Sequence, residues 1–238
     1  EYAIPRLRHA VVRELVLDEY DNLWIATNMG LCRLNLKTKT HLFYNADKKN
    51  INAIPNDDIF DLLLADSLIY ITTGDGLSTY HYDKDSFVTY HLSDSLTRGD
   101  VVKNYGFFDI VEGEDGRYYI GSYSNGMLAF SPDTKEFKTS RRSDNIGRMV
   151  YAIIPDNNGF LWASTSKGIM KYSLATKEIT NYDVNDGLQG SEFTPNAFLR
   201  SKDGFIFFGG FNGFNYFRPA AIKLETRIPE VVVTKMIT

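Results

Sequence analysis

Short apolar runs alternate with polar turns along the whole chain, and one pattern of them occurs five times. In the first copy, residues 23–27 (Leu-Trp-Ile-Ala-Thr) are followed by a polar turn, a glycine and a second apolar run. The turn glycines are spaced 46, 50, 42 and 45 residues apart: Gly30, Gly76, Gly126, Gly168 and Gly213. Apolar runs of this length bounded by turns predict strands, and an all-strand repeat of this period predicts the blades of a β-propeller.

Four antiparallel strands are expected in each repeat. The innermost is short and apolar, at residues 12–17, 59–64, 107–111, 150–154 and 197–199. The second carries an aromatic residue that we expect at equivalent positions between adjacent blades: Trp24, Tyr70, Tyr119, Trp162 and Phe207. Each turn glycine then precedes the third strand, where we expect a backbone with positive φ.

The fourth strand is missing from the fifth repeat, where Phe217 is followed by Arg-Pro-Ala-Ala. Either residues 1–4 or sequence outside the chain would have to supply it. The repeats, at about 11–55, 56–100, 101–145, 146–190 and 191–219, could close a five-bladed ring or form part of a seven-bladed ring. We favour the seven-bladed ring, because terminal blades need a cap or closure and the chain ends abruptly.

Composition narrows the classes of function. Of 238 residues, 43% are hydrophobic and 14% aromatic, which suits half-buried strands. The net charge of −4 provides no basic field, so we expect no contact with nucleic acid. One cysteine cannot form an intramolecular disulfide, and no run approaches the roughly 20 apolar residues of a membrane span. Because the chain begins with Glu1 and stops within an apolar run, we expect a fragment.

Two kinds of motif resemble a known family. Residues 21–31 (Asp-Asn-Leu-Trp-Ile-Ala-Thr-Asn-Met-Gly-Leu) and 158–169 resemble the repeat of regulator propellers in hybrid two-component sensors. Residues 185–193 (Asn-Asp-Gly-Leu-Gln-Gly-Ser-Glu-Phe) and 201–219 are similar to the last blade of these propellers. The tail resembles the start of the immunoglobulin-like sandwich that follows them, so residues 220–238 would form a linker and its first strand.

This resemblance implies a non-enzymatic, periplasmic sensor domain of a membrane-bound hybrid histidine kinase. Such receptors detect oligosaccharides and regulate polysaccharide-utilisation genes through a phosphorelay. The resemblance also implies no cofactor, contacts with other propeller and sandwich domains of the same receptor, and a homodimer. The second repeat departs from the motif, since Asp66-Ser67 replaces the usual glycine turn. No motif residue is a ligand contact, so the resemblance implies a fold and a role but no site.

Metal binding and catalysis have little support in the sequence. The four histidines (His9, His41, His81 and His91) have no metal-ligand spacing, so we predict no metal site. A propeller lyase or glycosidase is an alternative function, and a protein-interaction scaffold is another. A glycosidase needs two carboxylates that face each other. Glu192 and Asp144 lie in expected entrance loops, but the sequence does not show whether they pair.

Ligand binding is the better-motivated function for the loops. In a propeller, the loops between blades and the turns between second and third strands share one face. Aromatic rings can stack on the apolar face of a sugar, while Arg and Asn bind its hydroxyl and acidic groups. The sequence-predicted binding residues are Tyr105, Tyr123, Arg141, Arg142, Arg148, Glu192, Phe211 and Asn212.

Overall fold

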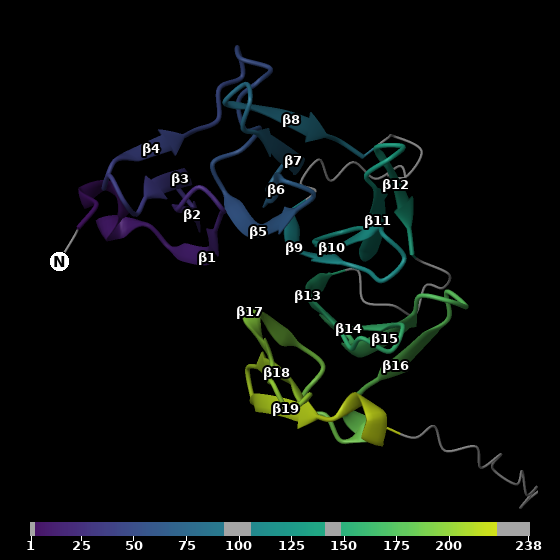
Figure 1. Ribbon diagram of the computed structural model, residues 1–238. Coiled ribbons are helices and arrows are strands. Elements are labelled where there is room, and N and C mark those ends of the chain that lie inside the picture. The colour runs from purple at the N-terminus through teal and green to yellow at the C-terminus, as the bar shows by residue number, and fades with distance from the viewer. Residues whose placement is uncertain (1–2, 93–105, 141–148, 223–238) are drawn as a thin grey trace, which may run out of the picture.

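The computed structural model describes residues 3–92, 106–140 and 149–222. Within these residues the protein is all-β, with five antiparallel sheets arranged around a common axis (Figure 1). Four sheets have four strands, and the last has three. The β-propeller fold predicted from the repeat is therefore confirmed, and among the described residues the fifth blade has three strands.

Consecutive strands pair in chain order within every blade. The first two blades consist of β1 (Val12–Leu17), β2 (Asn22–Thr27), β3 (Gly30–Asn35), β4 (His41–Tyr44), β5 (Ile59–Ala65), β6 (Leu68–Thr73), β7 (Gly76–His81) and β8 (Ser86–Tyr90). The other three consist of β9 (Phe107–Glu112), β10 (Tyr118–Ser122), β11 (Met127–Ser131), β12 (Glu136–Thr139), β13 (Val150–Pro155), β14 (Phe160–Thr165), β15 (Gly168–Ser173), β16 (Ile179–Tyr182), β17 (Phe193–Arg200), β18 (Ile206–Gly210) and β19 (Gly213–Phe217).

The blades form an open arc with their first strands innermost (Figure 1). Contacts join β1 to β5, β5 to β9, β9 to β13 and β13 to β17. No comparable contact joins β1 to β17 among the residues that the structure describes. A closed five-bladed ring is therefore not observed, and completion to seven blades stays a prediction.

The five aromatic residues of the second strands occupy equivalent positions. Each pairs with the fifth residue of its inner strand in the first four blades, as in Trp24 with Val16 and Trp162 with Ile154. Trp24, Tyr70, Tyr119 and Trp162 are buried between blades. Phe207 is only half-buried, because the described residues place no sixth blade against its face.

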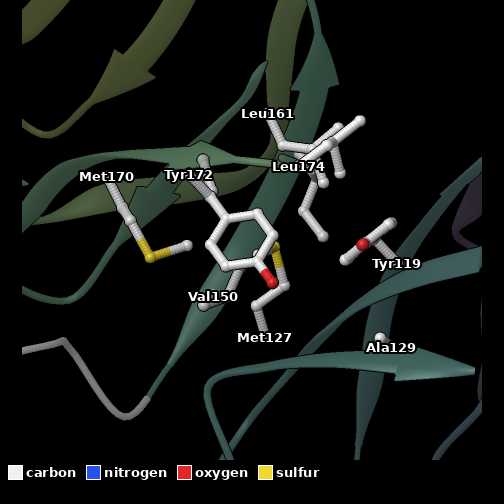
Figure 2. Close-up of a cluster of buried hydrophobic side chains, with 10 residues drawn as sticks. Tyr119, Met127, Ala129, Val150, Leu161, Met170, Tyr172 and Leu174 are labelled. Carbon is white, nitrogen blue, oxygen red and sulfur yellow. The ribbon is translucent and has the colours of Figure 1, made fainter. Parts of the chain in front are cut away.

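The hydrophobic core is divided into clusters that lie between adjacent blades. Figure 2 shows the cluster between the third and fourth blades, where Tyr119 and Met127 lie opposite Leu161 and Tyr172. A separate cluster surrounds Trp24 between the first two blades. Each blade thus buries its faces against its neighbours, as expected for a repeat protein.

The five turn glycines all have positive φ, as predicted, with values of 107°, 146°, 69°, 106° and 122° in chain order. They differ in the space around them. A Cβ at Gly168 would clash with the carbonyl oxygen of Tyr182, whereas one at Gly213 would meet no atom within 4 Å.

We expect Gly168→Ala to lower the free energy of unfolding by about 2–3 kcal/mol, because strain in φ adds to a backbone clash. Gly213→Ala is the matched control, since it has the φ strain without the clash, and we expect about 1 kcal/mol. Urea unfolding of both variants measures the difference. Equal losses would show that the close approach to Tyr182 contributes nothing.

The start of the chain lies on the first blade. A short 3-10 helix, η1 (Pro5–His9), brings Ile4 and Leu7 against a cluster that contains Ile25 and Cys32. The Arg6 guanidinium lies 4.4 Å from the centre of the Phe43 ring. Ile4 therefore covers the outward face of the first blade, and the possibility that residues 1–4 complete the fifth blade is wrong for the described part of that segment.

Carboxylates of the half-buried Asp61 and the buried Asp109 link consecutive inner strands. Asp61 on β5 accepts a 2.9 Å hydrogen bond from the backbone N–H of Ile110 on β9. One blade further, Asp109 accepts from the N–H of Ile153 on β13. At the equivalent position of the fourth blade stands Ala152, which pairs with Ser164 as Asp61 pairs with Thr72. The carboxylate links therefore end at the fourth blade.

Candidate functional site: an aromatic band on the inner strands

A bulge near the start of each inner strand positions one unpaired side chain. In the first four blades the strand register shifts around the second residue, which is Arg13, Phe60, Phe108 or Tyr151. Bulges reorient side chains and are common beside functional sites. All four of these side chains are half-buried. In the second, third and fourth blades the preceding residue, Ile59, Phe107 or Val150, is fully buried.

These side chains contact one another along the inner side of the arc. The ring centres of Phe60 and Phe108 are 5.1 Å apart, and those of Phe108 and Tyr151 are 6.0 Å apart. The Arg13 guanidinium lies 4.3 Å from the centre of the Phe60 ring. We name Arg13, Phe60, Phe108 and Tyr151 the aromatic band. It presents three rings and one cation over four consecutive blades.

Arg13 is held in place at one end of the aromatic band. It donates hydrogen bonds to Asp58 at 2.6 Å and to the carbonyl oxygen of Ile59 at 2.7 Å. The side chain of Arg13 is 18% exposed and that of Asp58 is 42% exposed. The ion pair therefore orients the guanidinium and leaves a carboxylate accessible beside it.

Two sequence-predicted residues lie at the other end of the aromatic band. The ring of Tyr123, which is 43% exposed, lies 6.2 Å from that of Phe108. Burial raises the pKa of Tyr151, and the negative charge of the nearby Glu192 raises it further. Tyr123 therefore lies beside Phe108, and the charge of Glu192 acts on Tyr151; that these residues bind a ligand stays a prediction.

The other sequence-predicted residues are not brought to the aromatic band. Phe211 is 77% exposed in the turn between β18 and β19, and Asn212 bonds to Gln189. In the described part of the chain, no contact joins either residue to Tyr123. The possible catalytic residue Asp144 lies outside the described residues. So do the remaining sequence-predicted binding residues: Tyr105, Arg141, Arg142 and Arg148.

Asp61 and Asp109 are two neighbouring carboxyl groups with raised pKa values, so we consider whether they form a catalytic pair. Burial raises the pKa of Asp61 to about 6, and burial with the charge of Asp61 raises that of Asp109 well above its usual value. Shifts of this kind can mark catalytic residues. Here both carboxyl groups accept backbone N–H groups, and Asp109 is only 3% exposed. This arrangement joins strands and does not present a reactive group.

The described residues contain no group of three or more His, Cys, Asp or Glu side chains arranged to hold a metal ion. Nor does that part of the chain include a helix long and apolar enough to cross a membrane.

The aromatic band leaves a signal in the sequence that alignment of the inner strands would reveal. The repeats read Val-Arg-Glu-Leu from residue 12, Ile-Phe-Asp-Leu from 59, Phe-Phe-Asp-Ile from 107 and Val-Tyr-Ala-Ile from 150. The second position is large in every copy. Sequence reasoning that sought the site in loops missed these residues, because they lie inside strands assumed to be structural.

The chain resembles one curated protein in sequence and several solved structures in fold. No family profile matches the chain. Over 214 residues, 89% of this chain, it is 23% identical to Histidine kinase P4 of Formosa agariphila, of which it covers 16%. The extracellular domain described as that of the hybrid two-component system BT4673 of Bacteroides thetaiotaomicron matches with a TM-score of 0.73 and 20% identity, over 86% of this chain and 27% of that one.

A second extracellular domain, described as that of the hybrid two-component system BT3049 of the same organism, gives a TM-score of 0.69 at 22% identity. The match covers 88% of this chain and 27% of that one. These two structural neighbours are thus extracellular domains of hybrid two-component systems, which agrees with the resemblance seen in the sequence motifs. The chain spans about a quarter of the length of these structures and about a sixth of that of the kinase.

Proposed function

We propose that the chain is part of the extracytoplasmic, periplasmic sensor region of a hybrid two-component histidine kinase, and that it binds an oligosaccharide at the aromatic band. The observation that carries the ligand proposal is the run of half-buried rings at Phe60, Phe108 and Tyr151 on adjacent inner strands. Rings of this kind stack on the apolar faces of sugars. Arg13, Asp58 and Glu192 supply donors and acceptors for hydroxyl groups.

The role of the chain in the receptor would be to transmit the binding signal toward the membrane. Extracellular domains of hybrid two-component systems share the fold, and a histidine kinase shares the sequence pattern over most of this chain. The regulated genes would be those for polysaccharide use, and the receptor would act as a homodimer. In this proposal the kinase activity belongs to another part of the polypeptide.

Contacts with further domains of the same receptor are supported by the outer face of the fifth blade. There the ring planes of Phe207 and Tyr216 stack with their centres 5.8 Å apart, and Phe214 and Tyr216 are 62% and 61% exposed. Apolar surfaces of this kind mark interaction sites. We propose that a further blade or the immunoglobulin-like domain begun by residues 220–238 covers this face.

The prediction that tests the ligand site uses two exposed aromatic residues. A glycan array with the full ectodomain identifies the oligosaccharide, and calorimetry then measures its affinity for variants. We expect Tyr123→Ala to weaken binding by about 1 kcal/mol, roughly fivefold, because a stacking plane beside Phe108 is lost. Thermal stability should change little, because the ring is 43% exposed.

Phe211→Ala is the matched control, since Phe211 is also a turn aromatic but makes no contact with the aromatic band. The affinity of the Phe211→Ala variant for the oligosaccharide should equal that of the unmodified protein. A loss with Phe211→Ala and none with Tyr123→Ala would place the ligand elsewhere. Cleavage of the glycan that Glu192→Gln abolishes would instead support the enzyme alternative, and absence of any glycan ligand would support a protein-interaction scaffold.

A further inference from the structure

The guanidinium of Arg13, which is the one cation of the aromatic band, is already paired within the chain. Its Nη1 atom donates to a carboxylate oxygen of Asp58 at 2.6 Å and to the carbonyl oxygen of Ile59 at 2.7 Å. Both N–H groups of this nitrogen are thereby used. A ligand carboxylate is held best by two parallel N–H groups, and the forked edge that includes Nη1 is closed to it.

The ring of Phe60 covers one face of the same guanidinium, since its centre lies 4.3 Å from the Arg13 Cζ atom. The side chain of Arg13 is therefore only 18% exposed. Its Nε–H and the two N–H groups of Nη2 remain as donors for a ligand. They can meet the oxygen of a hydroxyl group, whereas an acidic group would find a positive charge that Asp58 already offsets.

Three carboxyl groups lie near the residues of the aromatic band. Asp58 is 42% exposed beside Arg13. Burial raises the pKa of Asp61, the residue after Phe60, and the nearby charge of Glu14 on β1 raises it further. At the other end, the charge of Glu192 acts in the same way on Tyr151. Asp58, Glu14 and Glu192 thus place three negative charges against the one guanidinium.

We propose that the aromatic band selects uncharged oligosaccharides and that Asp58 is the residue that excludes acidic ones. This inference rests on the proposed oligosaccharide site and names the class of sugar that the site takes. Two adjacent hydroxyl groups of a sugar can accept from Arg13 and donate to Asp58, because a guanidinium only donates and a carboxylate only accepts. A uronic acid in the same place would bring its carboxylate against that of Asp58, and like charges in contact suppress binding of the wrong partner.

Matched pairs of oligosaccharides, measured by calorimetry with the full ectodomain, test the selection. The two members of each pair have the same linkage and differ in charge: cellotetraose and the β-1,4-linked tetramer of glucuronic acid, and the methyl-esterified and free forms of tetragalacturonic acid. A glycan array that contains such pairs extends the comparison to other backbones. We expect the uncharged member to bind at least tenfold more tightly in every pair that binds.

Two failures are distinguishable in this comparison. If no oligosaccharide binds, the proposed function fails. If oligosaccharides bind but the acidic member binds equally well or more tightly, the selection inferred here is overturned while the oligosaccharide site stands. Tighter binding of acidic members would support the sequence-predicted arginines as ligand contacts: Arg141, Arg142 and Arg148.

The variant Asp58→Asn tests the residue itself, because it removes the charge and keeps the shape of the side chain. We expect the affinity for the acidic member, relative to that for the uncharged member, to rise at least tenfold. The gain should shrink at high salt, since it is electrostatic. Asp57→Asn is the matched control: the Asp57 carboxylate accepts from Asn45 at 2.9 Å and from the N–H of Ala46 at 2.7 Å, at the end of the outer strand β4.

The ratio of the two affinities in Asp57→Asn should equal that of the unmodified protein. An unchanged ratio in Asp58→Asn, or the same change in both variants, would overturn the role of Asp58. Circular dichroism checks that both variants fold, and the comparison of paired oligosaccharides on the unmodified protein does not depend on either variant.

Discussion

Trp24→Ala should lower the free energy of unfolding by about 3–5 kcal/mol, as is usual for removing a buried tryptophan. The ring is fully buried between the first two blades and packs against Tyr44 and Tyr80. Its indole N–H donates a 2.8 Å hydrogen bond to Asp18, which would lose this donor. Urea unfolding followed by circular dichroism measures the loss.

Phe214→Ala is the control for this experiment, since Phe214 is also aromatic but 62% exposed on the fifth blade. It should change the free energy of unfolding by less than about 0.5 kcal/mol, as surface substitutions usually do. If the two variants lost the same amount, the packing between blades would not be what stabilises the fold.

Stability should fall as the pH rises from about 4 to 8, because two buried carboxyl groups hold protons that the unfolded chain releases. The pKa of Asp61 is raised from 3.8 to about 6, and that of Asp109 lies well above 3.8. Above pH 4 the folded state therefore binds more protons than the unfolded state, and each rise in pH favours unfolding.

The variant Asp109→Asn removes one of these charges and keeps an oxygen that can accept from the Ile153 N–H. We expect its stability to depend less on pH, and at pH 8 to exceed that of the unmodified protein by about 1–3 kcal/mol. Asp83→Asn, at an exposed turn residue, is the control for the Asp-to-Asn substitution itself. The explanation fails if the unmodified protein becomes more stable between pH 4 and 8, or if Asp109→Asn is the less stable protein at pH 8.

Residues that act within one repeat could be predicted from the sequence, whereas those that act between repeats could not. The spacing of Gly30 and its counterparts is sufficient to predict the strands and the positive φ of these glycines, since both depend on local backbone geometry. The aromatic band depends on which residue is unpaired at a bulge, and that is decided by pairing with a distant strand. Asp61 and Asp109 looked like ordinary strand residues, because their backbone partners belong to the next blade.

The carboxylate links have a consequence for how such a propeller changes over evolution. In the third blade, the N–H of Ile110 donates a hydrogen bond to Asp61 of the second blade, and Asp109 accepts one from the N–H of Ile153 in the fourth. One repeat therefore carries both a donor and an acceptor of these links. A tandem duplication of this unit would insert a blade already equipped to join both neighbours. The fifth blade is attached differently, by Arg200 to the carbonyl oxygens of Pro155 and Asp156. The carboxylate links thus join the second, third and fourth blades, while the fifth blade is attached by its own contacts.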